Sequence, residues 1–177
     1  MAGKEVPEVA TEITLEVVGE EKRETLRGIL RDDIPEAFVD SSDTIMDINA
    51  YGVAHGCIGH AYAVKQGDAY IGMLLIGEAV PWETDPPEMG LTPFYRLMGF
   101  VIDRRYRGRG IGSCALEAAI AAVYREYGVR PIALGVHRDN TRAAAFYLRH
   151  GFQKTAYREG NDTYYLRYPS DGKTAPV

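Results

Sequence analysis

The stretch LMGFVIDRRYRGRGIGSCALEAAIAAVYREY, residues 97–127, decides the fold of this 177-residue chain. Its first six residues form an almost continuous apolar run, as expected of a strand that is covered on both faces. Residues 105–112, RYRGRGIG, then combine three glycines with three arginines. Glycine permits a tight turn and a close ligand, and a helix that begins at about Gly110 would direct free N–H groups into that turn. The stretch therefore predicts a strand, a turn and a helix that hold a phosphate-bearing ligand.

Two familiar phosphate motifs are excluded by single residues. No Gly-Lys-Ser/Thr follows the turn, so it is not a P-loop, and the third glycine of the dinucleotide fingerprint would fall at Ser113. A turn with solvated arginines is the plain structural alternative. The pattern that fits is Arg-x-x-Gly-x-Gly at Arg107, Gly110 and Gly112. On these residues the chain resembles GNAT-type N-acetyltransferases, whose motif A has this form and holds the pyrophosphate of acetyl-CoA.

A second motif follows one strand–helix–strand crossover later, in residues 140–152, NTRAAAFYLRHGF. On a helix, Asn140, Ala143 and Tyr147 share one side. Taken alone, Asn140 would be only a helix cap and Tyr147 only a core aromatic. The full pattern, Asn-x-x-Ala-x-x-apolar-Tyr-x-x-x-Gly-Phe, closely resembles motif B of GNAT enzymes. Together the two motifs cover about residues 97–152.

The resemblance implies the GNAT fold, an α/β fold with a central mixed sheet, splayed parallel fourth and fifth strands and about four flanking helices. We expect one acetyltransferase domain over residues 1–177, with a core at about 12–168 and flexible tails at 1–11 and 169–177. The local patterns predict strands at 13–17, 131–136 and 163–168, helices at 19–30, 41–54 and 141–150, a hairpin at 60–77, and an irregular loop at 81–93.

The amino-acid composition limits the kinds of molecule that the protein is expected to bind. The net charge of −5 disfavours nucleic acid as a partner and favours a cationic one. The sequence contains no long apolar run and no signal-peptide core, so we expect no membrane association. Its two cysteines, Cys57 and Cys114, lack metal-ligand spacing. We therefore expect a reduced, cytoplasmic protein that needs no metal.

The resemblance also implies site roles, with acetyl-CoA as co-substrate and direct attack by an amine. Backbone groups of Phe100, Val101 and Ile102 would bind the pantetheine arm. The residues implied for the pyrophosphate are Arg107, Gly108, Arg109, Gly110, Ile111, Gly112 and Ser113, with Arg105 as a further source of charge. Asn140 would contact the pantetheine. Tyr147 would contact the coenzyme and act as the general acid that protonates the departing thiolate.

The general base is left open. Some GNAT enzymes carry a glutamate at the start of the central strand, where this chain has Tyr95 and Arg96. Glu78, at the end of the preceding strand, is our first candidate. Asp103 and His137 are the alternatives, although Asp103 is also placed to cap the turn or to pair with an arginine.

The acceptor is predicted to be a small-molecule amine. Residues 95–103, YRLMGFVID, are similar to the polyamine acetyltransferase branch of GNAT enzymes. An acidic mouth for a polycation would come from Asp40, Asp43, Asp47, Glu78, Glu83, Asp85 and Glu88. A protein or peptide amine is the second enzymatic interpretation, and a non-catalytic acyl-CoA-binding module is the third. A homodimer is expected by analogy with the family alone.

Overall fold

The fold is a seven-stranded mixed sheet in the order β1-β2-β3-β4-β5-β7-β6. The computed structural model describes residues 12–169, so the predicted flexible tails fall almost entirely outside the described residues. The strands are β1 (Thr14–Val18), β2 (Gly59–Gln66), β3 (Ala69–Glu78), β4 (Tyr95–Ile102), β5 (Ile132–His137), β6 (Gln153–Glu159) and β7 (Asp162–Arg167). All neighbouring strands run antiparallel except β4 and β5, which run parallel as predicted.

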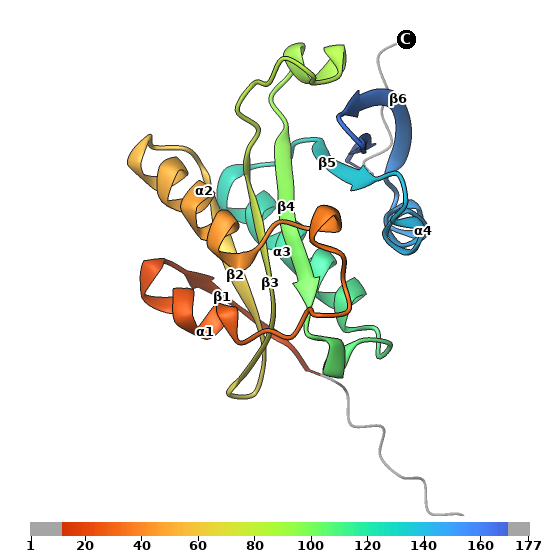
Figure 1. Cartoon of the computed structure of the whole chain (residues 1–177). Coiled ribbons are helices and arrows are strands. Elements are labelled where there is room, and N and C mark those ends of the chain that lie inside the picture. Colours follow the sequence, from red (N-terminus) through yellow and green to blue (C-terminus); the bar gives the residue numbers. More distant parts are fainter. Residues whose placement is uncertain (1–11, 170–177) are drawn as a thin grey trace, which may run out of the picture.

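Helices cover both faces of the sheet (Figure 1). The α-helices are α1 (Arg23–Arg27), α2 (Ser42–Ala54), α3 (Ile111–Tyr127) and α4 (Thr141–Arg149). Short 3₁₀ turns are η1 (Glu20–Lys22), η2 (Glu36–Phe38), η3 (Pro87–Gly90) and η4 (Arg104–Tyr106). One apolar core lies between the sheet and α3, and a second lies between the sheet and the helices α1 and α2. Burial on both faces explains why β3 and β4 read as apolar runs in the sequence.

The strands β4 and β5 separate soon after they meet, and this separation positions the site. Their pairing is limited to Tyr95 with Ile132 and Arg96 with Ala133, both at the start of β4. Beyond that point β5 continues along β7 and diverges from β4 (Figure 1). The carboxyl-terminal half of β4 therefore faces a gap where its neighbour would be, which confirms the splayed pair that the resemblance implied.

A bulge in β4 accompanies this divergence. The register against β3 shifts between Met73 and Leu75. In a regular strand, residues three apart face opposite sides of the sheet, but Met98 and Val101 both pack toward α2. Gly99 allows the bulge because its φ is 62°, in the left-handed region. A Cβ at this position would lie 2.3 Å from Cγ1 of Ile45 on α2, so the strand is as close to the helix as a glycine permits.

Three local predictions need correction. The predicted helix at 19–30 is only η1 followed by the five-residue α1, because after Gly28 the chain turns so that the Leu30 amide can donate to Asp103. The loop at 81–93 contains one short turn, η3. The strand β6 is absent from the predictions, because all its residues except Thr155 are exposed and no apolar alternation marks it.

Residues 12–169 contain neither a membrane-spanning helix nor a cluster of metal-binding side chains. No helix in that range is both long enough and apolar enough to cross a bilayer. The same residues contain no group of three or more His, Cys, Asp or Glu side chains arranged to hold a metal ion.

Candidate active site

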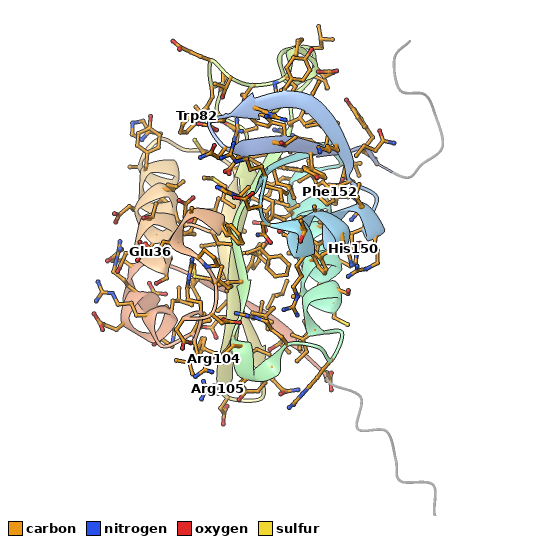
Figure 2. The ribbon with its side chains drawn as sticks, turned by 45° about the vertical axis from the view of Figure 1, so that its right-hand side comes forward. Glu36, Trp82, Arg104, Arg105, His150 and Phe152 are labelled. Carbon is orange, nitrogen blue, oxygen red and sulfur yellow. The ribbon has the colours of Figure 1, made fainter. Side chains whose placement is uncertain are left out.

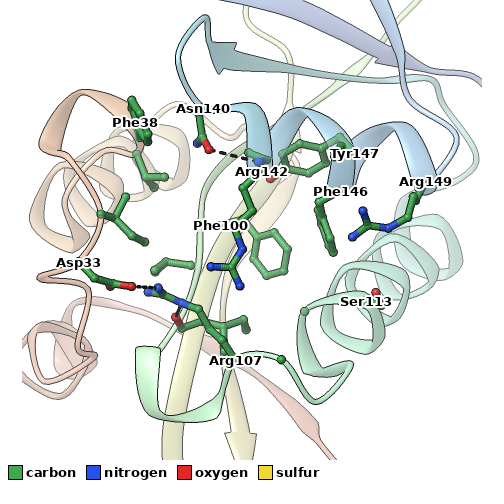
Figure 3. Close-up of a pocket in the computed structure, with 18 of the residues that line it drawn as sticks. Asp33, Phe38, Phe100, Arg107, Ser113, Asn140, Arg142, Phe146, Tyr147 and Arg149 are labelled. Carbon is green, nitrogen blue, oxygen red and sulfur yellow. Dashed lines mark hydrogen bonds and ion pairs between the residues drawn. The ribbon is translucent and has the colours of Figure 1, made fainter.

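The glycine turn and α4 line a cavity of about 740 Å³, which we call the turn cavity (Figure 3). It lies where β4 and β5 have separated, between the end of β4, the start of α3 and the inner side of α4. The segment 33–39, between α1 and α2, covers its remaining side. Ten of the residues expected at the coenzyme line it, namely Phe100, Val101, Ile102, Arg107, Gly108, Gly110, Gly112, Ser113, Asn140 and Tyr147.

The turn presents backbone donors to this cavity. Gly108 and Gly110 have φ values of 80° and 76°, and a Cβ on either would meet no atom within 4 Å. These two glycines are therefore needed for the left-handed backbone rather than for space. Gly110 is the N-cap of α3, so the first N–H groups of this 17-residue helix have no acceptor within it. Together with the helix dipole they favour an anion.

Arg107 supplies the charge at the turn. Its Nε donates to the carbonyl oxygen of Ile102 over 2.8 Å, and its Nη1 forms an ion pair with Asp33 (Figure 3). Its Nη2 is buried and has no hydrogen-bond partner among residues 12–169. A buried guanidinium N–H without an acceptor is costly, so it is a ready donor to an anionic ligand such as a diphosphate.

The other residues expected at the pyrophosphate are not all in place. Arg105 turns away and holds Asp103. Arg109 is exposed and does not line the cavity with its side chain. The side chain of Ile111 is buried in the core under α3, so only its amide is near the turn. Of the three arginines in the motif, Arg107 alone lines the turn cavity.

Two arginines that the sequence analysis did not select also line the turn cavity. Arg142 and Arg149 lie seven residues apart on α4, which is two helical turns, and Phe146 lies between them on the same side (Figure 3). The guanidinium of Arg149 lies over the Phe146 ring, 6.0 Å from its centroid. The spacing Arg-x-x-x-Phe-x-x-Arg was the signal that could have identified them.

A second cavity of about 620 Å³ adjoins the first. We call it the hairpin cavity, because the β6–β7 hairpin contributes Glu159, Asn161, Asp162 and Tyr164 to its wall. Figure 2 shows Trp82, another of its lining residues, beside the β6 and β7 strands. The two cavities share Phe38, Val39, Phe100, Asn140, Ala143 and Tyr147. They therefore meet in the gap between β4 and β5.

Tyr147 stands at this junction. Only 9% of the residue is exposed, and its ring packs edge-on against Phe146 and Phe152. Burial raises the pKa of its phenol, so the hydroxyl keeps its proton at neutral pH. Asn140 begins the same helix and caps it, because its Oδ1 accepts the Ala143 N–H over 3.2 Å. That bond leaves the amide Nδ2 of Asn140 available at the junction.

The acids of the hairpin cavity are mostly not those expected. Asp40 does line it, together with Glu159 and Asp162. Asp43 and Asp47 instead pair with arginines of α1. Asp85 is held by Arg96 and by the Tyr164 hydroxyl, while Glu78, Glu83 and Glu88 lie outside the cavity.

Asp162 has the environment of a base. Burial raises the pKa of its carboxyl, and the nearby carboxylates Glu159 and Asp40 raise it further, while His137 opposes them. Asp162 pairs with His137 across the β5–β7 ladder. The Asp162 side chain lies beside Gly135 of β5, where a Cβ would be 3.5 Å from its Oδ2, an ordinary van der Waals contact.

The three expected base candidates fare differently. Glu78 is exposed at the end of β3 beside Cys57 and lines neither cavity, so the structure does not bring it to the junction. Asp103 is fully buried, and hydrogen bonds from Arg105 and the Leu30 amide hold its pKa below the usual range. His137 does line the hairpin cavity. Its Nδ1 accepts the Asp139 N–H, so the neutral ring keeps its hydrogen on Nε2 and presents a donor.

Comparisons with known proteins place this site in a family. The model of the acetyltransferase (GNAT) family matches residues 23–152. The spermine/spermidine N(1)-acetyltransferase of Bacillus subtilis (strain 168) is 39% identical over 54 residues, which cover 30% of this chain and 36% of that protein. The chain thus matches only about a third of the length of that relative.

Solved structures share the fold. PaiA N-acetyltransferase from Thermoplasma acidophilum, in complex with coenzyme A, has a TM-score of 0.65 at 16% identity, with 89% of this chain and 99% of that one covered. Arabidopsis thaliana Naa50, in complex with a bisubstrate analogue, has a TM-score of 0.59 at 19% identity, with 87% and 96% covered. The family match spans most of the chain and contains both motifs and the turn cavity, and on this evidence the chain belongs to the GNAT family of acetyltransferases.

Proposed function

We propose that this protein transfers the acetyl group of acetyl-CoA to a primary amine, and that a polyamine is its preferred acceptor. The observation that carries the proposal is the meeting of the turn cavity and the hairpin cavity at Tyr147. One cavity is built for an anion and the other is lined by carboxylates, so a donor and a cationic acceptor can approach the same point from opposite sides.

The turn cavity would hold the donor. The free N–H groups at the start of α3 and the unpartnered Nη2 of Arg107 fit the diphosphate of the coenzyme. The edge of β4 that β5 leaves uncovered would bind the pantetheine arm as an added strand, through backbone groups of Phe100 and Val101. The Ile102 carbonyl already accepts a hydrogen bond from Arg107, so it is less available to the pantetheine arm than the sequence implied.

Tyr147 would act as the general acid. The amine nitrogen attacks the thioester carbonyl carbon, the C–N bond forms and the C–S bond breaks. Tyr147 gives its hydroxyl proton to the sulfur as that bond breaks, which its raised pKa permits at neutral pH. The new amide nitrogen loses one proton, and this proton restores the phenol. A backbone N–H at the β4 bulge would stabilise the developing charge on the carbonyl oxygen.

Asp162 replaces Glu78 as our candidate for the base. An acceptor ammonium must lose a proton before it can attack, and a carboxylate with a raised pKa removes it better than one with a lowered pKa. Asp162 would take this proton directly or through one water molecule. Glu159 and Asp40 would hold the other ammonium groups of the acceptor.

Two observations favour a polyamine. The three acids line one cavity that is bordered by the aromatic rings of Trp82 and Tyr164, and this combination suits a flexible chain with several ammonium groups. The local match to the Bacillus subtilis relative, whose name gives spermine and spermidine as substrates, supports the same acceptor class.

An acceptor panel tests the proposal. The full chain is supplied with acetyl-CoA and with spermine, spermidine, butylamine or a peptide with a free amino terminus, and release of the CoA thiol is followed. We expect kcat/KM to be highest for the polyamines. Equal rates for butylamine and the polyamines would contradict the polyamine preference. A higher rate for the peptide would favour the hypothesis that a protein or peptide amine is the acceptor. Coenzyme binding without turnover of any amine would indicate a non-catalytic binding module.

The hairpin acids provide a sharper version of this test. Glu159→Gln should raise KM for spermine by about fivefold while leaving KM for acetyl-CoA unchanged, because one ion pair with a mobile cation is lost. Glu83→Gln is the matched control, since Glu83 is exposed on the neighbouring loop and lines neither cavity. Equal effects of the two substitutions would mean that the acids act only through overall charge.

A further inference from the structure

A chain of hydrogen bonds runs outward from the turn cavity through three side chains. The Oγ of Ser113, which lines the cavity, lies 2.9 Å from Nε2 of His150. The Nδ1 of His150 lies 2.9 Å from Oε1 of Glu117, and Glu117 is also held by Arg167 at 2.8 and 3.1 Å. Ser113 and Glu117 are one turn apart on α3, while His150 is the C-cap of α4. Figure 3 shows Ser113 near the start of α3, and Figure 2 places His150 at the end of α4.

The direction of these hydrogen bonds depends on one proton. Burial favours a neutral Glu117, but hydrogen bonds from Arg167 and His150 hold its pKa below the usual value, so it only accepts. His150 must therefore carry hydrogen on Nδ1. When the ring is neutral, Nε2 is an acceptor and the Ser113 hydroxyl donates to it. When the ring is protonated, Nε2–H donates to Ser113, and the hydroxyl hydrogen is free to point into the cavity.

We propose that His150 is a positioning residue for the coenzyme diphosphate, and that its protonation redirects the Ser113 hydroxyl from donating to His150 to donating to a phosphate oxygen. The proposal rests on the proposed function only in taking the turn cavity as the diphosphate site. Binding of the diphosphate then takes up a proton at His150. The coenzyme should therefore bind more tightly when His150 is protonated than when it is neutral.

The surroundings of His150 are suited to a cation at this position. Glu117 on α3 contacts the ring, and the carboxyl end of α4 places partial negative charge beside it. Arg149 on α4 and Arg167 on β7 disfavour a positive charge on His150, although Arg167 directs its guanidinium to the Glu117 carboxylate. The Phe146 ring, one helical turn earlier on α4, packs against the imidazole with 4.7 Å between the ring centroids.

The same three residues, Ser113, His150 and Glu117, also have the order of a serine hydrolase triad. Two features favour the positioning role. Glu117 shares its charge with Arg167, which weakens its ability to stabilise an imidazolium formed during catalysis. Ser113 lies among the anion donors of the turn, whereas Tyr147, at the cavity junction, is the group placed for acyl chemistry.

The test measures binding rather than turnover. The dissociation constant of 3′-dephospho-CoA, whose diphosphate stays ionised, is determined by calorimetry between about pH 5 and pH 8, where histidine titrates. The full chain should bind about fivefold more tightly at the acidic end, as expected for one added hydrogen bond to an anion. In His150→Gln, whose side chain is neutral throughout, this pH dependence should disappear.

His60→Gln is the matched control. His60 also contacts a glutamate of α3, at 2.9 Å from Glu126, but it lines neither cavity. Its pH profile should equal that of the unmodified chain. An unchanged profile in His150→Gln would overturn the proposal while leaving the diphosphate site intact, and failure to bind at any pH would overturn the site itself. Fluorophosphonate labelling and ester hydrolysis that both vanish in Ser113→Ala would replace the positioning role by a hydrolase.

Discussion

The Nε atom of Arg107 donates a hydrogen bond to the carbonyl oxygen of Ile102 across 2.8 Å. The bond ties the glycine turn back to the last residue of β4 and fixes the guanidinium beside the uncovered edge of that strand. One guanidinium nitrogen, Nη2, is thereby buried and finds no acceptor within residues 12–169, while Nη1 faces Asp33. The guanidinium that we propose as a phosphate donor is thus held in place without a ligand, and the Asp33 carboxylate would compete with a phosphate for it.

Removing the Asp33 carboxylate, which competes with a phosphate for Arg107, should strengthen coenzyme binding. Asp33→Asn leaves the Arg107–Ile102 bond in place but removes a negative charge from the wall of the turn cavity. We expect the Kd of CoA at low salt to fall about threefold, with a smaller change at high salt because of screening. Asp32→Asn is the control, since Asp32 pairs with Arg104 outside the cavity. A weaker affinity in Asp33→Asn would instead mean that Asp33 orients Arg107.

Loss of the Tyr147 hydroxyl should affect the chemical step alone. In Tyr147→Phe the ring keeps its packing on Phe146 and Phe152, so the melting temperature should hardly change. We expect kcat to fall about 100-fold, as for a lost general acid, with little change in KM for acetyl-CoA. Tyr165→Phe removes a hydroxyl from another buried tyrosine that lines neither cavity and should keep full activity. Wild-type turnover in Tyr147→Phe would exclude the acid role.

Gly112 offers the cleanest steric test of the turn. Gly110 has a φ of 76°, so a side chain there would strain the backbone. Gly112 instead belongs to α3, and a Cβ there would make ordinary contacts with Phe146 at 3.7 Å and with Ile102 at 3.9 Å. Gly112→Val should raise the Kd of CoA at least about tenfold by blocking the helix N-terminus. Ala118→Val, on the exposed side of the same helix, controls for helix propensity. Equal affinities in the two variants would argue against a diphosphate at this turn.

Asp103 should contribute a pH-dependent part of the stability. Its carboxylate is buried and hydrogen bonds from Arg105 lower its pKa, so its contribution is complete above the unfolded value and is lost as pH falls. Asp103→Asn should lower the free energy of unfolding at pH 7 by about 2–4 kcal/mol. In urea titrations this deficit should shrink below about pH 4. If the loss of unfolding free energy does not change with pH, Asp103 stabilises the fold through packing and not through its charge.

The central part of the fold was predictable because its signals are local. The apolar run of β4, the glycines of the turn and the cap at Asn140 each act over a few residues, and the structure has them where the sequence indicates. The parallel β4–β5 pair follows from the helix between them. Pairing over only two residues depends on the glycine bulge and on α2, which no local pattern reveals.

The acceptor side was less predictable because it depends on contacts between distant segments. Asp85 is acidic in the sequence, but the buried guanidinium of Arg96 neutralises it. Glu159 and Asp162 reach the cavity through the hairpin, whose first strand is too exposed to carry an apolar pattern. Glu78 is near the start of β4 in the ladder, yet its side chain ends beside Cys57.

The β6–β7 hairpin carries two of the three acids that line the hairpin cavity. The family model ends at residue 152, immediately before β6 begins, so the matched residues contain the turn cavity but neither Glu159 nor Asp162. The hairpin pairs with the sheet only through β5, at its outer edge. Exchanging only the tip of the hairpin, residues 159–162, for that of a relative should therefore change the choice of amine, while β7 keeps its place in the core and Arg167 keeps its contact with Glu117.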